Sequence, residues 1–487
     1  MSLTRVGAAR QALAKGLAVQ GADRDMVMTA VERRGLPELG GERLLLLPHQ
    51  RHRAVMRLVT PPAWWGTRAA RAEGFDVLAQ AIAAVADAAR QAGGALTVPG
   101  VSLDGTAVPP DGDLHRLETT DPVERELLYQ LLRRHSPTLI ALAGRGSFSP
   151  GGRRDRIGSR WLADSGEHLT AREIGPVTER HLERVYAELR RRDGISHLDR
   201  MDLAPAEDGR TVLVRCLDAQ ATLAEVRAHM LLLDALALRA RGQARKGQRQ
   251  RPVRQDLLDD NRARAVAEGL RAVFIEDRPQ KPGRDRDDTR RGDTGRDDAR
   301  RGGPRRDAPG RDEPRRGGPA GERRERRRPA RQAARALLDD LVPELAKLDA
   351  TAEELLPLLN LVELPGRTRP PCGQDLLRLD TARRPPAETL RAGLTDTRPG
   401  GPLLPTVVAS HPGSAALMLQ AWRAALAAGE PLRERRGRDE PGRPGRAGPR
   451  REDRPPSHRR RRPPGKGPGA APDGRRDQGQ ARGGNQQ

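Results

Sequence analysis

Arginine side chains and glycine-rich turns are the features with which this sequence could do chemistry. Between Pro137 and Glu276, several arginines, a few acids and two glycine-rich turns, one of them at 144–152, fall near the ends of predicted strands. Backbone amides in such turns, together with guanidinium groups, hold phosphates and carboxylates. The block therefore predicts recognition of an anion, although a glycine-rich turn by itself most often only reverses the chain.

Other catalytic and metal-binding arrangements are poorly represented. Ser159 and Ser165 lie near His168, but neither serine stands in the strand–turn–helix elbow of a hydrolase nucleophile. The histidines show no metal-binding spacing, and neither do Cys216 and Cys372. Two distant cysteines exclude a disulfide framework and fit a reducing compartment, so we expect a cytoplasmic protein.

The elements that must position these residues follow from the spacing of apolar side chains. Short apolar runs predict strands at 44–47, 54–59, 95–98 and 211–218. Apolar residues at three- and four-residue steps, or helix-like composition, predict helices at 1–20, 68–91, 179–191, 223–241, 255–270, 334–348 and 415–426, and one that Asp121 and Glu124 begin as a capping pair. Strands interspersed with helices of unequal length favour an α+β fold.

Four segments of this block occur in an order that resembles a known family. They are Ser136–Gly144, Arg156–Arg160, the strand Thr211–Asp218 with its Arg-x-x-Asp ending, and Asp260–Leu270, which reads Asn-Arg-x-x-Ala-x-x-x-Gly-Leu from its second residue. The chain resembles the glutamate–cysteine ligases of the second type, which are carboxylate–amine ligases with a glutamine synthetase-like fold. The resemblance covers roughly residues 50–277.

The resemblance implies a curved, largely antiparallel sheet with flanking helices that holds ATP and Mg²⁺. It also implies that a small carboxylate is activated as an acyl phosphate and then attacked by a small amine, with charge neutralised by metal and arginine. Arg215, as a phosphate or carboxylate clamp, and Arg160 are the implied catalytic residues. The implied substrate- or nucleotide-binding residues are Arg172, Asn261, Arg262 and Ser159.

The sequence departs from the family pattern where Mg²⁺ would bind. Mg²⁺ prefers carboxylate oxygens, yet the strand at 54–59 has no acid and Leu213 stands where the pattern has glutamate. The histidine-rich strand expected before residue 121 is reduced to His115, and the N-terminal acidic strand is absent. Either other acids hold the metal or the protein no longer ligates anything. The candidate acids are Asp218 and Glu118, with Asp164, Glu167, Asp199 and Asp202 as further possibilities.

Long Arg/Gly/Pro-rich segments separate the patterned parts of the 487-residue chain. They have too little apolar surface to offset the entropy of ordering, so we expect them to be disordered. We accordingly divide the chain into a ligase-like α+β domain at 1–277, a disordered linker at 278–330, a helical segment at 331–428 that completes or follows the first domain, and a disordered basic tail at 429–487.

The formal charge of +23 leaves two interpretations open. The arginine-rich arms bind nucleic acid or another polyanion, which would make the chain a non-catalytic binding protein, or arginine replaces lysine for compositional reasons, as in a GC-rich genome. The arms lack the interleaved aromatic residues of single-strand binders. No apolar run of 18 residues occurs, so we expect no contact with a membrane.

Overall fold

The computed structural model describes residues 9–103, 108–144, 159–164, 170–172, 187, 201–206, 208–276, 326–364 and 385–432. All of them belong to one compact unit that extends to Asp439. Most of the glycine-rich turn at 144–152, the helix expected at 179–191 apart from position 187, and the arginine-rich segments at 277–325 and 433–487 lie outside the described residues.

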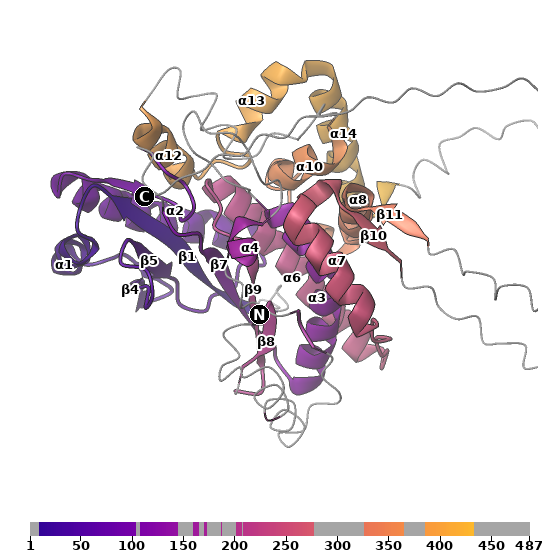
Figure 1. Cartoon of the computed structure of the whole chain (residues 1–487). Helices are drawn as coiled ribbons and strands as arrows, with labels where there is room; N and C mark the ends of the chain where they lie inside the picture. The colour runs from indigo at the N-terminus through magenta and orange to yellow at the C-terminus, as the bar shows by residue number, and fades with distance from the viewer. Residues whose placement is uncertain are drawn as a thin grey trace, which may run out of the picture. The chain divides into compact units, whose positions relative to one another are not determined.

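A seven-stranded antiparallel sheet forms the centre of this unit (Figure 1). Six strands follow the order β4-β5-β1-β7-β9-β8, and β6 pairs with the end of β1. The strands are β1 (Arg10–Gln20), β4 (Leu45–Pro48), β5 (Val55–Val59), β6 (Ala95–Thr97), β7 (Gly112–Glu118), β8 (Leu203–Pro205) and β9 (Thr211–Asp218). The expected mixture of helices with an antiparallel sheet is confirmed.

The first twenty residues correct the sequence-based prediction. The composition of 1–20 favours a helix, but Arg10–Gln20 is β1, the strand that pairs with β5, β6 and β7. Alanine, leucine and lysine have high helix propensity, which pairing with three strands overrides. The family pattern has an acidic strand near the N-terminus. This chain has a strand there, β1, but β1 contains no aspartate or glutamate. His115 lies in a second strand that the apolar runs did not predict, β7.

Four helices of the first half of the chain lie close to their predicted positions, whereas those at Arg24–Arg34 and Arg160–Asp164 were not predicted. Asp121 caps α3 by accepting hydrogen bonds from the backbone N–H groups of Val123 (2.8 Å) and Glu124 (2.9 Å). The helices of this half are α1 (Arg24–Arg34), α2 (Arg68–Gln91), α3 (Pro122–Ala143), α4 (Arg160–Asp164), α6 (Leu223–Arg245) and α7 (Gln255–Glu268), which a 3₁₀ turn, η2 (Gly269–Arg271), follows. A two-stranded hairpin, β2 (Glu38–Leu39) with β3 (Glu42–Arg43), precedes β4.

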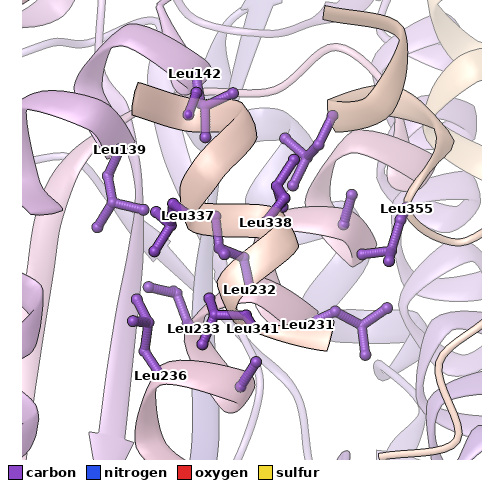
Figure 2. Packing of buried hydrophobic residues seen from close by; sticks show 14 of the residues in the cluster. Leu139, Leu142, Leu231, Leu232, Leu233, Leu236, Leu337, Leu338, Leu341 and Leu355 are labelled. Atoms are coloured by element: carbon purple, nitrogen blue, oxygen red, sulfur yellow. The ribbon is translucent and has the colours of Figure 1, made fainter. Parts of the chain in front are cut away.

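Most C-terminal segments pack into the same hydrophobic core as α3 and α6, whereas Leu390 and Leu394 lie in the cluster that contains α2. Figure 2 shows leucines of α3 and α6 meeting Leu337, Leu338 and Leu341. The segments comprise β11 (Arg327–Pro329), α8 (Ala330–Asp340), α9 (Val342–Lys347), α10 (Leu356–Glu363), α12 (Pro386–Thr395), α13 (Leu403–Ser410) and α14 (Pro412–Ala428). β11 pairs with β10 (Val273–Ile275), so residues 277–325 are inserted between two hydrogen-bonded strands.

A buried ion pair joins α2 to the turn before α10. Arg71 donates to both carboxylate oxygens of Glu354, at 2.9 and 3.0 Å, and both side chains are 1% exposed. The guanidinium also donates to the carbonyl of Leu348 at 2.9 Å. Because a lone charge at this depth would be strongly unfavourable, Arg71 and Glu354 depend on one another.

A second buried polar contact joins β1 to α6. The side-chain amide of Gln11 donates to the carbonyl of Met230 at 3.0 Å, one turn before the buried Asp234. Burial raises the pKa of Asp234 to about 7, against the effects of Gln11 and Arg71. Oδ1 of Asp234 and Oε1 of Gln11 have no hydrogen-bond donor among the described residues. When Asp234 is protonated, its carboxyl group can donate a hydrogen bond in a place where these two oxygen atoms otherwise have no donor.

One face of the sheet packs on helices. Leu13 and Leu17 of β1 lie in a hydrophobic cluster with residues of α1 and α2, while Val212 and Val214 of β9 lie in a cluster with α3 and α6. Side chains alternate along a strand, so Ala14 and Gly16 of β1 and Leu213 of β9 point to the other face. None of the helices in the described part of the chain is long and apolar enough to cross a lipid bilayer.

The other face carries one arginine on each of four neighbouring strands. The register places Arg57 of β5 opposite Gly16, Arg116 of β7 opposite Ala12, and Arg10 of β1 opposite Glu118. Leu213 of β9 lies opposite Arg116, and Arg215 follows two residues later on the same side. We call this surface the arginine face and define it by Arg10, Arg57, Arg116 and Arg215.

Candidate functional site

Three arginines of the arginine face have acidic neighbours at different depths. Arg57 holds the buried Asp111 with two hydrogen bonds, of 3.1 and 2.8 Å. Arg10 meets the half-exposed Glu118 at 3.2 Å, and the exposed Arg116 lies 3.9 Å from Asp208. Arg57 with Asp111 is therefore a fixed pair, whereas the contact of Arg116 with Asp208 is a weak surface contact.

Arg215, the residue singled out first from the sequence, is half-buried on β9. Its backbone N–H donates to the carbonyl of Asp202 at 2.8 Å. The side chain of Asp202 is in turn gripped by Arg262 of α7, with Nη2 2.9 Å from Oδ1 and Nε 2.5 Å from Oδ2. Burial raises the pKa of Asp202, and the Arg262 guanidinium opposes that rise. The structure thus brings Arg215 and Arg262 together through Asp202.

Asn261 lies in α7, and Arg172 contacts the same helix. Asn261 accepts from the N–H of Ile275 (2.8 Å) and donates to the carbonyl of the same residue (2.9 Å), which ties α7 to β10. Arg172 lies 3.9 Å from Asp259 of α7, and its backbone carbonyl accepts the hydroxyl of Tyr129 at 2.7 Å. These contacts tie α7 to β10 and to Arg172.

The short helix α4 lies over the arginine face at the end of β9. Ser159 donates its hydroxyl to Oδ1 of Asp218 and accepts the N–H of Leu162 at 3.2 Å, so it links the strand end to the start of α4. A Cβ placed on Gly112, which pairs with Asp218, would lie 2.1 Å from Cζ3 of Trp161. Only glycine leaves room for the indole. Arg160 is the first residue of α4, and its side chain lies outside the described atoms.

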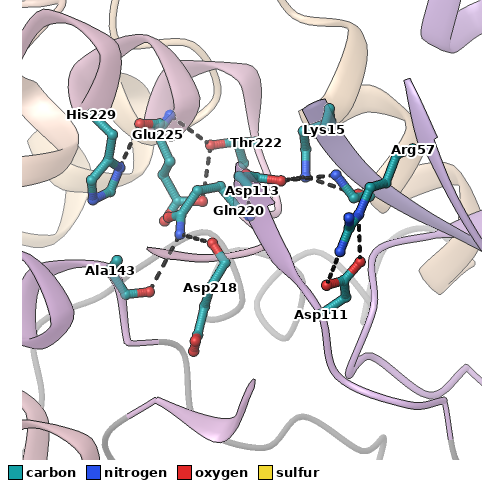
Figure 3. Close-up of polar contacts among 11 residues, drawn as sticks. Lys15, Arg57, Asp111, Asp113, Ala143, Asp218, Gln220, Thr222, Glu225 and His229 are labelled. Carbon is teal, nitrogen blue, oxygen red and sulfur yellow. Dashed lines mark hydrogen bonds and ion pairs between the residues drawn. The ribbon is translucent and has the colours of Figure 1, made fainter. Parts of the chain in front are cut away.

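A buried polar network lies on the other side of the same strand ends (Figure 3). Asp113 accepts three hydrogen bonds, from Lys15 Nζ (2.8 Å), from the N–H of Gly16 (3.0 Å) and from the N–H of Gln220 (2.9 Å). Lys15 and Asp113 are almost fully buried. Burial raises the pKa of Asp113, and the charge of Lys15 opposes that rise. A buried ion pair of this kind fixes the positions of the groups around it, whereas its net contribution to the free energy of folding is small or unfavourable.

Gln220 extends this network to the end of α3. Its side-chain amide donates to the carbonyl of Asp218 (2.5 Å) and to the carbonyl of Ala143 (3.3 Å). The N–H of Ala219 donates to the carbonyl of Asp111 at 3.2 Å. Residues 218–220 are therefore held by β7, α3 and α4 together.

His49 completes the surroundings of Asp111. Its Nδ1 accepts the N–H groups of Arg51 and His52, both at 3.2 Å, while Nε2 lies 3.8 Å from Oδ2 of Asp111. The pKa of His49 is lowered mainly by burial, with Asp111 acting in the opposite direction. A neutral His49 leaves Arg57 as the cation that neutralises Asp111.

The acids of the described residues do not fit a magnesium site. Nowhere in the described ranges do three or more histidine, cysteine or acidic side chains group so that they could hold a metal ion. Asp218 is bonded to Ser159, Glu118 to Arg10 and Asp202 to Arg262. Glu167 and Asp199, and the side chain of Asp164, lie outside the described part. Leu213, apolar, stands on the arginine face beside Arg215.

Sequence reasoning missed the residues that organise this site. Arg57, Asp111, Asp113 and Gln220 were not singled out, and neither was Lys15. Two signals could have found them: lysine is rare in this arginine-rich chain, and Asp111 and Asp113 flank Gly112, where a strand begins. Their pairing depends on strand register, however, since Lys15 and Asp113 are 98 residues apart.

No protein-family model matches the chain, and no curated protein sequence matches it. Among solved structures it is similar to a chain in the complex between the prokaryotic ubiquitin-like protein Pup and its ligase PafA, with 10% identity over 84% of this chain and 80% of that chain and a TM-score of 0.40. It is also similar to a bifunctional glutathione synthetase from Pasteurella multocida, with 10% identity, a TM-score of 0.37, and 86% of this chain covered. The match spans about half of that enzyme, 53% of its chain. Likenesses at these TM-scores assign neither fold nor function.

Proposed function

We propose that this chain is a degenerate carboxylate–amine ligase, which binds a small carboxylate on its arginine face but lacks a strand-held magnesium ion. Arg116 and Arg215, on the adjacent strands β7 and β9, are the residues that contact the anion. ATP-dependent formation of an acyl phosphate, which the family resemblance implies, is not carried out.

The observation that supports this proposal is the neutralisation of acids by fixed cations. Lys15 faces Asp113 at 2.8 Å, Arg57 faces Asp111 at 2.8 Å, and Arg10 faces Glu118 at 3.2 Å. In a metal-dependent ligase, acids on the central strands serve a divalent cation, because a hard cation prefers carboxylate oxygen. Here basic side chains of neighbouring strands occupy that electrostatic role, so a metal ion would have to displace them.

Without a metal ion, the arginine face can bind a carboxylate but cannot activate it. Guanidinium groups bind carboxylates through paired hydrogen bonds. Arg116 is exposed, and its contact with Asp208, at 3.9 Å, is weak enough for an anion to replace. Leu213 next to it offers an apolar contact to a substrate chain. A small amino acid with a second carboxylate fits this combination of charge and apolar surface.

Binding of L-glutamate by the full chain, measured by isothermal titration calorimetry with and without EDTA, tests the proposal. We expect binding that EDTA leaves unchanged and that Arg215→Met weakens about ten- to a hundredfold, since a hydrogen bond to a charged group contributes about 1.5–3 kcal/mol. Arg90→Met, which removes an exposed arginine of α2, is the matched control and leaves the affinity unchanged.

ATP hydrolysis, measured with Mg²⁺, glutamate and a panel of amines, tests the loss of catalysis. We expect no turnover above that of Arg215→Met. Magnesium-dependent turnover that Arg215→Met abolishes would show that the chain is an active ligase. Absence of glutamate binding in a folded sample would refute recognition by the arginine face.

A further inference from the structure

Asp113 of β7 stands out among the buried groups because its three hydrogen bonds reach two other parts of the fold. Lys15 and Gly16 belong to the strand β1, and Gln220 belongs to the connection between β9 and α6. A pairing irregularity falls between Asp113 and His115, where β7 meets β9. The carboxylate therefore lies where the regular ladder of the sheet is interrupted, and it joins β7 to β1 and to residue 220 after β9.

This arrangement is a costly way to obtain stability. Removing a lysine and an aspartate from water costs several kcal/mol each, and an apolar pair of similar size often gives an equal or more stable protein. Lys15 and Asp113 are 0% and 1% exposed. A role in fixing geometry accounts for their burial better than a role in stability.

Hydrogen bonds connect Asp113 to the short helix α4, which lies over the arginine face. Gln220, held by Asp113, donates to the carbonyl of Asp218. The carboxylate of Asp218 then accepts the hydroxyl of Ser159, which caps α4 over Gly112. Hydrogen bonds through Gln220, Asp218 and Ser159, two of them to backbone groups, thus connect a buried ion pair on one face of the sheet to the helix that covers the other face.

We propose that Asp113 is a positioning residue that, with Lys15 and through Gln220 and Asp218, holds α4 in place beside the anion-binding arginines. It does not touch the anion. This inference rests on the proposed function for its effect on binding, whereas its effect on α4 is independent of any ligand.

The test is a double substitution that removes the charges and keeps the volume, Lys15→Met with Asp113→Leu. We expect the single change Asp113→Asn to lower the melting temperature, because it leaves the Lys15 ammonium buried without its counter-charge. The double variant removes the lone charge and recovers the part of the loss that it causes, while the N–H groups of Gly16 and Gln220 stay without their acceptor. It binds L-glutamate at least tenfold more weakly and exchanges the backbone amides of residues 159–164 at least tenfold faster in deuterium oxide.

The matched control is a second buried ion pair far along the chain, Arg71→Met with Glu354→Leu, in which both side chains are equally buried. We expect this control to keep the affinity for glutamate and the exchange rate at 159–164. A Lys15/Asp113 double variant that binds glutamate and exchanges like the wild type would show that the pair is only structural. If the wild type binds no glutamate, the proposed function fails, and the exchange rates still decide whether Asp113 positions α4.

Discussion

The buried carboxyl group of Asp234 gives a prediction about stability and pH. Burial raises its pKa to about 7, and Oδ1 has no donor among the described residues. The group therefore stays protonated in the folded protein at mildly acidic pH, whereas in the unfolded chain it ionises near its ordinary value of 3.8. Asp234→Asn replaces the neutral acid with a side chain of nearly the same shape that cannot ionise.

The sign of the effect follows from proton binding. Between the unfolded and folded pKa values the folded protein binds a proton that the unfolded chain does not, so the free energy of unfolding falls as pH rises through this range. The stabilisation is complete below about pH 4 and is lost once the pH exceeds about 7. Each pH unit is worth about 1.4 kcal/mol, so the full range amounts to about 4 kcal/mol and the step from pH 5 to pH 7 to about 2–3 kcal/mol.

The assay is urea unfolding followed by tryptophan fluorescence, since Trp65 and Trp422 are buried in the native protein. Wild type and Asp234→Asn are compared at several pH values between 5 and 8. We expect the wild type to lose about 2–3 kcal/mol relative to the variant over this range. The difference between the two proteins is the informative quantity, because other ionisable groups change both in the same way.

Parallel pH profiles of the two proteins would refute this reasoning. They would mean that Asp234 is ionised when folded, with its charge balanced by Arg71 despite the pairing of Arg71 with Glu354. Asp234→Leu serves as a second variant, because it also removes the titration and keeps the site apolar. It should show the same pH dependence as Asp234→Asn even if its absolute stability differs.

Three further predictions concern packing and the inserted segment. Gly112→Ala should lower stability by about 1–3 kcal/mol, because its Cβ would lie 2.1 Å from Trp161, and an unchanged melting temperature would contradict that packing. Arg71→Met alone should cost about 3–5 kcal/mol by leaving Glu354 buried without a partner, as denaturant unfolding can measure, and adding Glu354→Leu should restore most of the loss. Replacing residues 277–325 with an Asn-Gly turn should keep the melting temperature within a few degrees, since the flanking strands already pair; a collapse of the fold would show that the segment supports the core.

The sequence predicts well where the periodicity of a segment is strong and its partners are near in the chain. The helix predicted at 68–91 is α2 with the same ends, and the strand predicted at 211–218 is β9. In both, apolar residues recur at the period of the element, so local pattern and tertiary environment agree. The helix that follows Asp121 begins where its capping side chain predicts.

The central strand shows why other elements were missed. β1 is paired on both sides and buried on both faces, so it lacks the alternation of polar and apolar residues that marks a half-exposed strand. Its alanines, leucines and lysine favour a helix locally, and only pairing with strands further along the chain makes it extended. No window of local sequence contains that information.

For the candidate site, the sequence by itself determined which side chains are present: arginines at the ends of predicted strands, Asp218 after Arg215, and a leucine at position 213 where the family pattern has an acid. Only the tertiary structure decided which charges face one another. Strand register brings Lys15 to Asp113 and Arg57 to Asp111, and thereby assigns the acids to fixed cations. The physical reason is that Coulomb interactions depend on distance in space, which folding sets between residues far apart in the chain.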